Sequence, residues 1–174
     1  MKFKILILII ITSSVFGLQY YLNQQKISTT QTSSNAAYNE TFPNIELLPL
    51  NSSPFQLNDK EGVLYLINLW ATWCGPCQYE IPHLNELYNE YHHEGIVIVG
   101  IALDDSDIPV KAFIKKQNID YPIIMFNKKL PSYLKNIPGV PTTLTLDASL
   151  RIIDVVIGYQ QKKYFEKMIK RAIN

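Results

Sequence analysis

Residues 63–70, VLYLINLW, form an unbroken run of mostly apolar side chains in the middle of the chain. Such a run is typical of a central strand that is buried on both faces of a sheet. A second run of this kind, IVIVGIAL at residues 96–103, follows a segment whose apolar residues have helical spacing. Buried strands that alternate with helices predict an α/β fold.

The remaining segments extend this pattern. Two small strands are expected within residues 42–50 and 54–58, joined by the turn-forming sequence NSSP. Helical spacing predicts helices at residues 75–91, kinked by Pro82, and around 110–116, with a helical turn near 130–134. Three further strands are expected at residues 121–126, 142–147 and 151–158, before a closing helix in which one face carries Tyr164, Phe165, Met168, Ile169 and Ala172. The sheet should therefore be mixed and covered on both faces.

The N-terminus has a different composition. Residues 5–22 carry no charge and follow Lys2 and Lys4, which is the pattern of a signal peptide cleaved after Gly17 or of an uncleaved membrane anchor. The two lysines would keep the N-terminus in the cytoplasm. Both alternatives predict an extracytoplasmic, periplasmic domain, and we favour an anchor in the inner (cytoplasmic) membrane.

The sequence divides the chain into three parts. Residues 1–22 are the signal peptide or anchor, and residues 23–40, rich in Gln, Ser, Thr and Asn, are expected to form a flexible linker. Such a linker has a root-mean-square reach of roughly 20–25 Å. Residues 41–174 should form one folded domain.

The charges argue against a nucleic-acid partner. The chain has 16 basic and 15 acidic residues. The basic ones are scattered singly or in pairs such as Lys162-Lys163, which we interpret as solvated surface. A nucleic-acid-binding protein would show a basic face or stripe instead.

Cys74 and Cys77 are the only cysteines, and three roles are open to them. As a structural disulfide they would close a loop so short that the stabilisation is roughly 2 kcal/mol, against nearly 5 kcal/mol for a loop of about 100 residues. As zinc or copper ligands they would need partners, and the three histidines, at positions 83, 92 and 93, have poor spacing for convergence. No metal site is therefore predicted.

A redox pair agrees best with the surrounding sequence. Helical spacing of three brings the two sulfurs within disulfide range. The positive end of a helix lowers the pKa of a thiol below its usual value of about 8.5. Pro76 fits the first helical turn, and Gly75 leaves the sulfur of Cys74 uncovered. The sequence thus predicts an activated thiol beside a resolving partner.

These motifs resemble the thioredoxin superfamily: WCGPC, Pro82 five residues later, and Val140-Pro141-Thr142. The segments NLWATWCGPCQYEIP and FPNIELLPLNSSPFQLNDKEG resemble its TlpA/ResA-like branch of extracytoplasmic thiol–disulfide oxidoreductases. The resemblance covers residues 42–174. It implies a thioredoxin-like fold, with a mixed central sheet flanked by helices, an N-terminal strand extension and a central insertion.

The resemblance also implies roles around the cysteines. Cys74 would be the attacking, more exposed cysteine and Cys77 the buried resolving one. Glu80 matches the acidic residue of the branch's CxxCxxE pattern, where it either handles the proton of Cys77 or is a solvent-facing helix residue. Asn68 stands where thioredoxin has a buried Asp, so the proton handling of thioredoxin does not transfer directly.

A second group of residues is expected to bind substrate. Pro141 matches the cis-proline that faces the cysteine pair, and Val140 would offer backbone hydrogen bonds to an extended substrate strand. Gly75 and Pro76, between the two cysteines, are expected to contact the substrate as well. Trp73 either shields the disulfide or only packs against neighbouring residues.

The predicted function is reduction of disulfides in exported proteins, with apocytochrome c before haem attachment as one such substrate. The Gly-Pro dipeptide resembles that of the reducing thioredoxins. The sequence shows no nucleotide-binding or flavin-binding fingerprint, so we expect no cofactor and a membrane or extracytoplasmic thiol protein as electron donor.

Three alternatives remain beside this prediction. Within the same chemistry, the chain could be an oxidase or isomerase of folding proteins. From another class, it could be a membrane-tethered metal-binding module that uses the cysteine pair. A peroxidase is disfavoured, because peroxiredoxins place Thr three residues before the reactive cysteine and this chain has Ala71 there.

Overall fold

The structure is a computed structural model that describes residues 18–19 and 40–174. Apart from Leu18, Gln19 and Glu40, the predicted N-terminal segment (1–22) and linker (23–40) lie outside these residues, and both stay predictions. Among the helices of the described part, none is long and apolar enough to cross a membrane.

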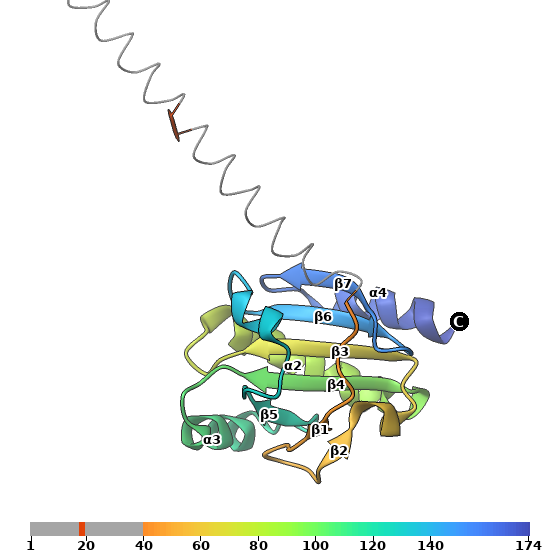
Figure 1. Ribbon diagram of the computed structural model, residues 1–174, viewed down its shortest axis with the longest axis horizontal. Coiled ribbons are helices and arrows are strands. Elements are labelled where there is room, and N and C mark those ends of the chain that lie inside the picture. The colour runs from red at the N-terminus through yellow and green to blue at the C-terminus, as the bar shows by residue number, and fades with distance from the viewer. Residues whose placement is uncertain (1–17, 20–39) are drawn as a thin grey trace, which may run out of the picture.

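A five-stranded sheet forms the centre of the domain (Figure 1). Its strands, in spatial order, are β5 (Ile123–Met125), β4 (Ile96–Ala102), β3 (Leu64–Trp70), β6 (Thr142–Asp147) and β7 (Ile152–Ile157). Strands β3, β4 and β5 are parallel, whereas β6 and β7 are antiparallel to their neighbours. Every residue of β3 is buried, because this strand has a neighbour on each side and a covered face above and below. The predicted mixed sheet is confirmed.

Helices and a small hairpin complete the domain. The α-helices are α2 (Gly75–Tyr91), α3 (Asp107–Gln117) and α4 (Lys162–Ile173), and α2 continues through Pro82. Strands β1 (Glu46–Leu47) and β2 (Phe55–Gln56) form the N-terminal hairpin. Short 3-10 helices are η1 (Leu57–Lys60), η2 (His92–Glu94) and η3 (Ser132–Asn136). Helix α3 and strand β5 lie between β4 and β6 in the sequence, and the predicted central insertion stays a prediction.

Several sequence-based expectations need correction. The strand expected within residues 42–50 is only Glu46–Leu47. The strand expected at 54–58 ends at Gln56, because the Asp59 carboxylate accepts a hydrogen bond from the Gln56 N–H (3.3 Å) and starts η1. Helix α3 begins three residues earlier than expected, since Ser106 caps it. On α4, Ala172 is exposed and Ile173 packs instead, because Ile173 continues the four-residue spacing of Phe165 and Ile169.

The two faces of the sheet are covered differently. Side chains alternate along each strand, so one set packs against α2, α3 and α4, and the other set packs against the hairpin, η1 and η3. In Figure 1 the hairpin lies in front of the sheet and α2 and α4 lie behind it. The sheet is covered on both faces, as predicted, but α-helices cover only one of them.

Asn51 ties the loop of the N-terminal hairpin to the segment before β5. Its Nδ2 donates to the carbonyl oxygens of Ile119 (3.2 Å) and Tyr121 (2.9 Å), and its Oδ1 accepts from the N–H of Ile123 (2.9 Å). Asn51→Ala should lower the free energy of unfolding by about 2–3 kcal/mol in urea denaturation, at about 1 kcal/mol per hydrogen bond. Ser53→Ala in the same loop is the control, since the side chain of Ser53 is exposed and its loss should change the free energy of unfolding by less than about 0.5 kcal/mol. Equal losses in the two variants would contradict this role of Asn51.

Candidate active site

The cysteine pair lies where β3 ends and α2 begins. Cys74 and Cys77 form a disulfide, with 5.3 Å between their Cα atoms. Cys74 caps the helix, and its sulfur accepts a hydrogen bond from the N–H of Cys77 (3.2 Å). In the reduced protein the same N–H group and the positive helix end would stabilise a thiolate on Cys74. The local structure therefore suits thiol–disulfide exchange.

The two sulfurs differ in their access to solvent. Cys74 is 5% exposed and Cys77 is fully buried. Gly75 leaves the approach open, because a Cβ atom at this position would meet nothing within 4 Å. Pro76 occupies the first turn of α2, where its missing N–H group breaks no helical hydrogen bond. Of the two cysteines, only Cys74 is therefore in contact with solvent.

The loop before β6 faces the pair from the other side. The peptide bond between Val140 and Pro141 is cis, as the resemblance implies. The carbonyl oxygen of Val140 lies 3.6 Å from the sulfur of Cys74. Thr142 fixes this loop, because its hydroxyl donates to the carbonyl of Gly139 (2.7 Å). The fold thus brings Val140 and Pro141 to the cysteines across 66 residues of sequence.

Glu80 is buried one helical turn after Cys77. It is 1% exposed, so the alternative of a solvent-facing glutamate is wrong. Its Oε1 accepts from the backbone N–H of Gln160 (2.7 Å), and its Oε2 accepts from Nδ2 of Asn68 (2.8 Å). Burial raises the pKa of Glu80 to about 7, and these two hydrogen bonds limit the rise. A carboxyl group of this kind can exchange a proton near neutral pH.

Asn68 holds Glu80 from the central strand β3. Its Nδ2 also donates to the hydroxyl of Thr143 on β6 (2.9 Å). Tyr121 is fully buried, and burial together with the charge of Glu80 raises the pKa of its hydroxyl. Sequence reasoning singled out Asn68 and Glu80 separately but found neither their contact nor Thr143, Tyr121 and Gln160. No spacing signal in the sequence joins these positions.

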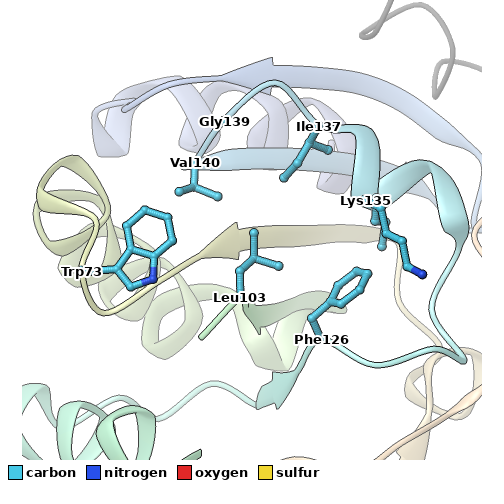
Figure 2. A pocket seen from close by; sticks show the side chains of 8 residues that line it. Trp73, Leu103, Phe126, Lys135, Ile137, Gly139 and Val140 are labelled. Atoms are coloured by element: carbon cyan, nitrogen blue, oxygen red, sulfur yellow. The ribbon is translucent and has the colours of Figure 1, made fainter. Parts of the chain in front are cut away.

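A groove opens beside the cysteine pair (Figure 2). It has a volume of about 450 Å³ and begins between Trp73 and Val140. Trp73 is 69% exposed, which contradicts the plain-packing alternative. The other residues that line the groove had no signal in the sequence and come from separate segments: Leu103, Phe126, Leu134, Lys135, Ile137 and Gly139. The groove is mostly apolar and has one cationic side chain.

The loop that carries Trp73 is held in place by polar contacts. The carboxylate of Asp104, just after β4, accepts hydrogen bonds from the N–H of Thr72 (3.0 Å) and from its hydroxyl. The side chain of Gln78 donates to the carbonyl of Thr72 (2.8 Å). These contacts fix the position of Trp73 at the mouth of the groove.

The described residues, 18–19 and 40–174, contain no group of three His, Cys, Asp or Glu side chains that could hold a metal ion. The cysteine pair offers two sulfur ligands, and a closed structural zinc site needs four ligands.

Comparison with known proteins identifies a matching family and similar proteins of known activity. The profile of the AhpC/TSA family matches residues 38–130. Thiol-disulfide oxidoreductase ResA of Bacillus thuringiensis (strain Al Hakam) is 27% identical over 172 residues, which cover 97% of this chain and 94% of the relative. Its counterpart from a strain of Bacillus cereus is 30% identical over 131 residues, covering 74% of this chain and 75% of the relative.

Solved structures give the same result. The crystal structure of a thiol:disulfide interchange protein of the thioredoxin family from Chlorobium tepidum TLS superimposes with a TM-score of 0.71. It is 30% identical and covers 79% of this chain and 99% of its own. Because the family profile matches more than half of the chain and the relatives agree with it in sequence and fold, the protein belongs to the AhpC/TSA family of the thioredoxin superfamily and is a thiol–disulfide oxidoreductase.

Proposed function

We propose that this oxidoreductase reduces disulfides in exported proteins, with Cys74 as the attacking and Cys77 as the resolving cysteine. The observation that carries the assignment of roles is the difference in access. Cys74 is 5% exposed, its sulfur lies 3.6 Å from the carbonyl oxygen of Val140, and its neighbour Trp73 lines the groove, whereas Cys77 is fully buried.

The reaction has two exchange steps. The Cys74 thiolate attacks one sulfur of the client disulfide, so that a mixed disulfide forms and the other client sulfur leaves as a thiolate that takes up a proton. The Cys77 thiolate then attacks the sulfur of Cys74. This releases the second client thiol and leaves the Cys74–Cys77 disulfide, so the client gains two electrons and two protons and the enzyme loses them.

Glu80 is proposed to take the proton from Cys77 in the second step. Residues three apart on a helix have Cβ atoms about 5–6 Å from each other, which is within reach of one intervening water molecule. With a pKa of about 7, the Glu80 carboxylate is basic enough to accept a proton and acidic enough to release it again. Asn68 and the N–H of Gln160 act as positioning groups for this carboxylate.

The client is proposed to bind as an extended segment. The backbone of Val140, next to cis-Pro141, offers hydrogen bonds, and Gly75 and Pro76 leave room for the client backbone. Apolar side chains beside the client cysteine would enter the groove past Trp73. Unfolded or extended polypeptides meet these requirements, and apocytochrome c before haem attachment is one such client.

The proposed location is outside the cytoplasm, with attachment to the cytoplasmic membrane through residues 1–22. The uncharged segment after Lys2 and Lys4 supports this location. Electrons would then come from a membrane or extracytoplasmic thiol protein that reduces the Cys74–Cys77 disulfide by the same exchange chemistry.

The reduction potential of the full chain, equilibrated with a series of dithiothreitol or glutathione buffers, tests the direction of electron flow. We expect a value near or below about −270 mV, which makes the disulfide form stable and the dithiol a good reductant. A value near about −120 mV would mean that the protein oxidises its clients. Tight stoichiometric binding of copper or zinc to the reduced protein, without disulfide reduction, would favour a metal-binding module instead.

A further inference from the structure

Helix α4 gathers positive charge on one face. Its sequence, KKYFEKMIKRAI, contains five basic residues and one acidic residue, in a chain with almost equal numbers of both. Phe165 and Ile169 pack into the core, so the opposite side of the helix faces solvent. The exposed basic face consists of Lys163, Lys167, Lys170 and Arg171. Their spacing of four, three and one residues places them along one stripe.

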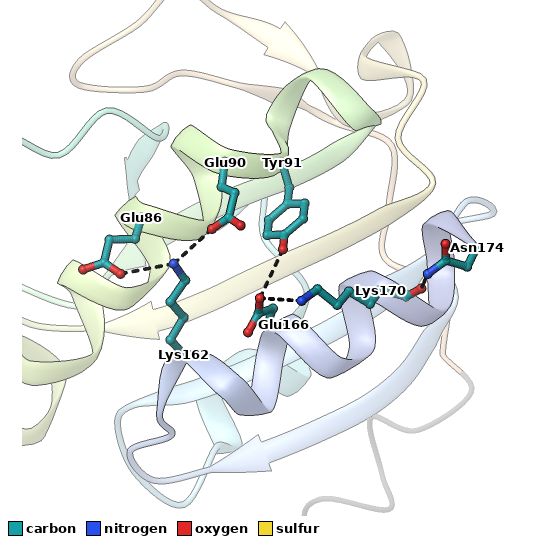
Figure 3. A network of polar contacts seen from close by, with 7 residues as sticks. All are labelled: Glu86, Glu90, Tyr91, Lys162, Glu166, Lys170 and Asn174. Atoms are coloured by element: carbon teal, nitrogen blue, oxygen red, sulfur yellow. Dashed lines mark hydrogen bonds and ion pairs between the residues drawn. The ribbon is translucent and has the colours of Figure 1, made fainter.

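Most of this charge is not neutralised within the domain. Figure 3 shows Lys162 between Glu86 (3.3 Å) and Glu90 (3.0 Å), at the contact between α2 and α4. Lys170 pairs with Glu166 (2.8 Å). Within the described part of the chain, Lys163, Lys167 and Arg171 have no carboxylate within 4.0 Å. The interpretation of Lys162-Lys163 as ordinary solvated surface is therefore incomplete, because only the helix shows that Lys163 belongs to a stripe.

The basic face of α4 lies near Glu40 and far from the cysteine pair. Glu40, at the end of the predicted linker, has a carbonyl oxygen that accepts a hydrogen bond from the N–H of Ile152 at the start of β7 (2.8 Å). Helix α4 follows β7 and runs back along it, so the C-terminal half of α4 lies at this same end of the sheet (Figure 1). The cysteine pair follows the other end of β3, about 20 Å away along the strand.

We propose that the basic face of α4 docks on an anionic phospholipid surface and holds the cysteine pair on the side away from the bilayer. The proposal rests on the proposed membrane attachment. Two features favour lipid as the occupant: the exposed face is cationic, and Glu40, which follows the predicted linker, lies at the same end of the sheet. If the predicted linker is flexible, its reach of roughly 20–25 Å would keep α4 within range of the headgroups. An acidic protein surface is the competing occupant.

Lysine acylation of the full chain, followed by mass spectrometry, tests the proposal. The chain is reconstituted in vesicles of phosphatidylcholine alone or of phosphatidylcholine with phosphatidylglycerol. Each cation near an anionic surface strengthens attachment roughly fivefold. Lys163 and Lys167 should therefore react at least about fivefold more slowly in the anionic vesicles, and high salt should abolish the difference. Lys115 and Lys116, which are exposed on α3, should react equally in both.

Two double variants with the same change in net charge distinguish an effect of the basic face from an effect of net charge. Lys163→Glu with Arg171→Glu should remove the protection of Lys167. Lys115→Glu with Lys128→Glu, at exposed positions elsewhere, should preserve it. Disulfide reduction should be unchanged in both double variants, because none of these residues lies at the cysteine pair.

The outcomes distinguish docking from anchoring. Flotation with pure phosphatidylcholine vesicles reports the anchor alone. If the chain does not float with them and Lys167 is still protected in anionic vesicles, the result supports docking of α4 and contradicts the membrane anchor. If Lys167 reacts equally in both vesicles, the docking proposal is overturned and an acidic protein becomes the better occupant.

Discussion

Cys77→Ser should trap the protein on its client as a stable mixed disulfide, whereas Cys74→Ser should form no adduct at all. The expected cause is the difference in access: only the sulfur of Cys74 can meet a client disulfide, and only Cys77 is placed to release it. Both variants should lose turnover in an insulin-reduction assay by at least about a thousandfold, since the two thiols act as one unit.

Non-reducing gels and mass spectrometry of the reduced variants with a disulfide-containing client identify the adduct. Blocking the remaining thiol of each variant with an alkylating agent before mixing is the control, because it should abolish the adduct of Cys77→Ser. An adduct formed by Cys74→Ser instead would show that the two roles are reversed.

Glu80→Gln should slow resolution of the mixed disulfide by about 100-fold at pH 8 and remove one ionisation from its pH dependence. In the native protein the carboxylate accepts the proton of Cys77 only when it is itself ionised. The rate of resolution should therefore rise through pH 7, where Glu80 titrates. Rapid-mixing measurements of client release between pH 5.5 and 8.5 check this, with exposed Glu86→Gln on the same helix as the control. An unchanged inflection near pH 7 in Glu80→Gln would contradict the role of Glu80.

The same carboxyl group makes folding stability depend on pH, with a defined sign. Its pKa is about 7 in the folded protein and 4.5 as the reference for the unfolded chain. Between these values the folded state binds a proton that the unfolded state has lost, so the free energy of unfolding falls as the pH rises. The contribution of Glu80 is present below pH 4.5 and is lost as the pH rises through 7, with a total of order 3 kcal/mol. Urea denaturation at a series of pH values measures this slope, which Glu80→Gln should remove.

Local patterns were enough to predict most of the fold. Helix α2 has the predicted limits, Gly75–Tyr91, because apolar spacing and the Gly-Pro first turn act within one segment. The buried strands β3 and β4 follow from continuous apolar runs. Errors arose where a side chain outside the pattern decided the boundary, as Asp59 does at η1 and Ser106 does at α3.

The cysteine pair could also be predicted, because both members and their helix end lie within four consecutive residues. The residues that surround the cysteine pair in space could not be predicted from local spacing. The resemblance, not the spacing, pointed to cis-Pro141, and it left two opposite environments open for Glu80. The groove beside Trp73 had no sequence signal, since its lining comes from four separate segments.

Residues that are close together in the chain were thus enough to predict the strands and helices, the family and the cysteine pair. The tertiary structure alone decided that Glu80 is buried against Asn68 and the N–H of Gln160, and that Val140 faces Cys74. It also decided where the basic stripe of α4 lies relative to Glu40. The physical reason is that desolvation, hydrogen bonding and surface charge depend on neighbours in space, and here those neighbours are 12 to 80 residues apart in the sequence.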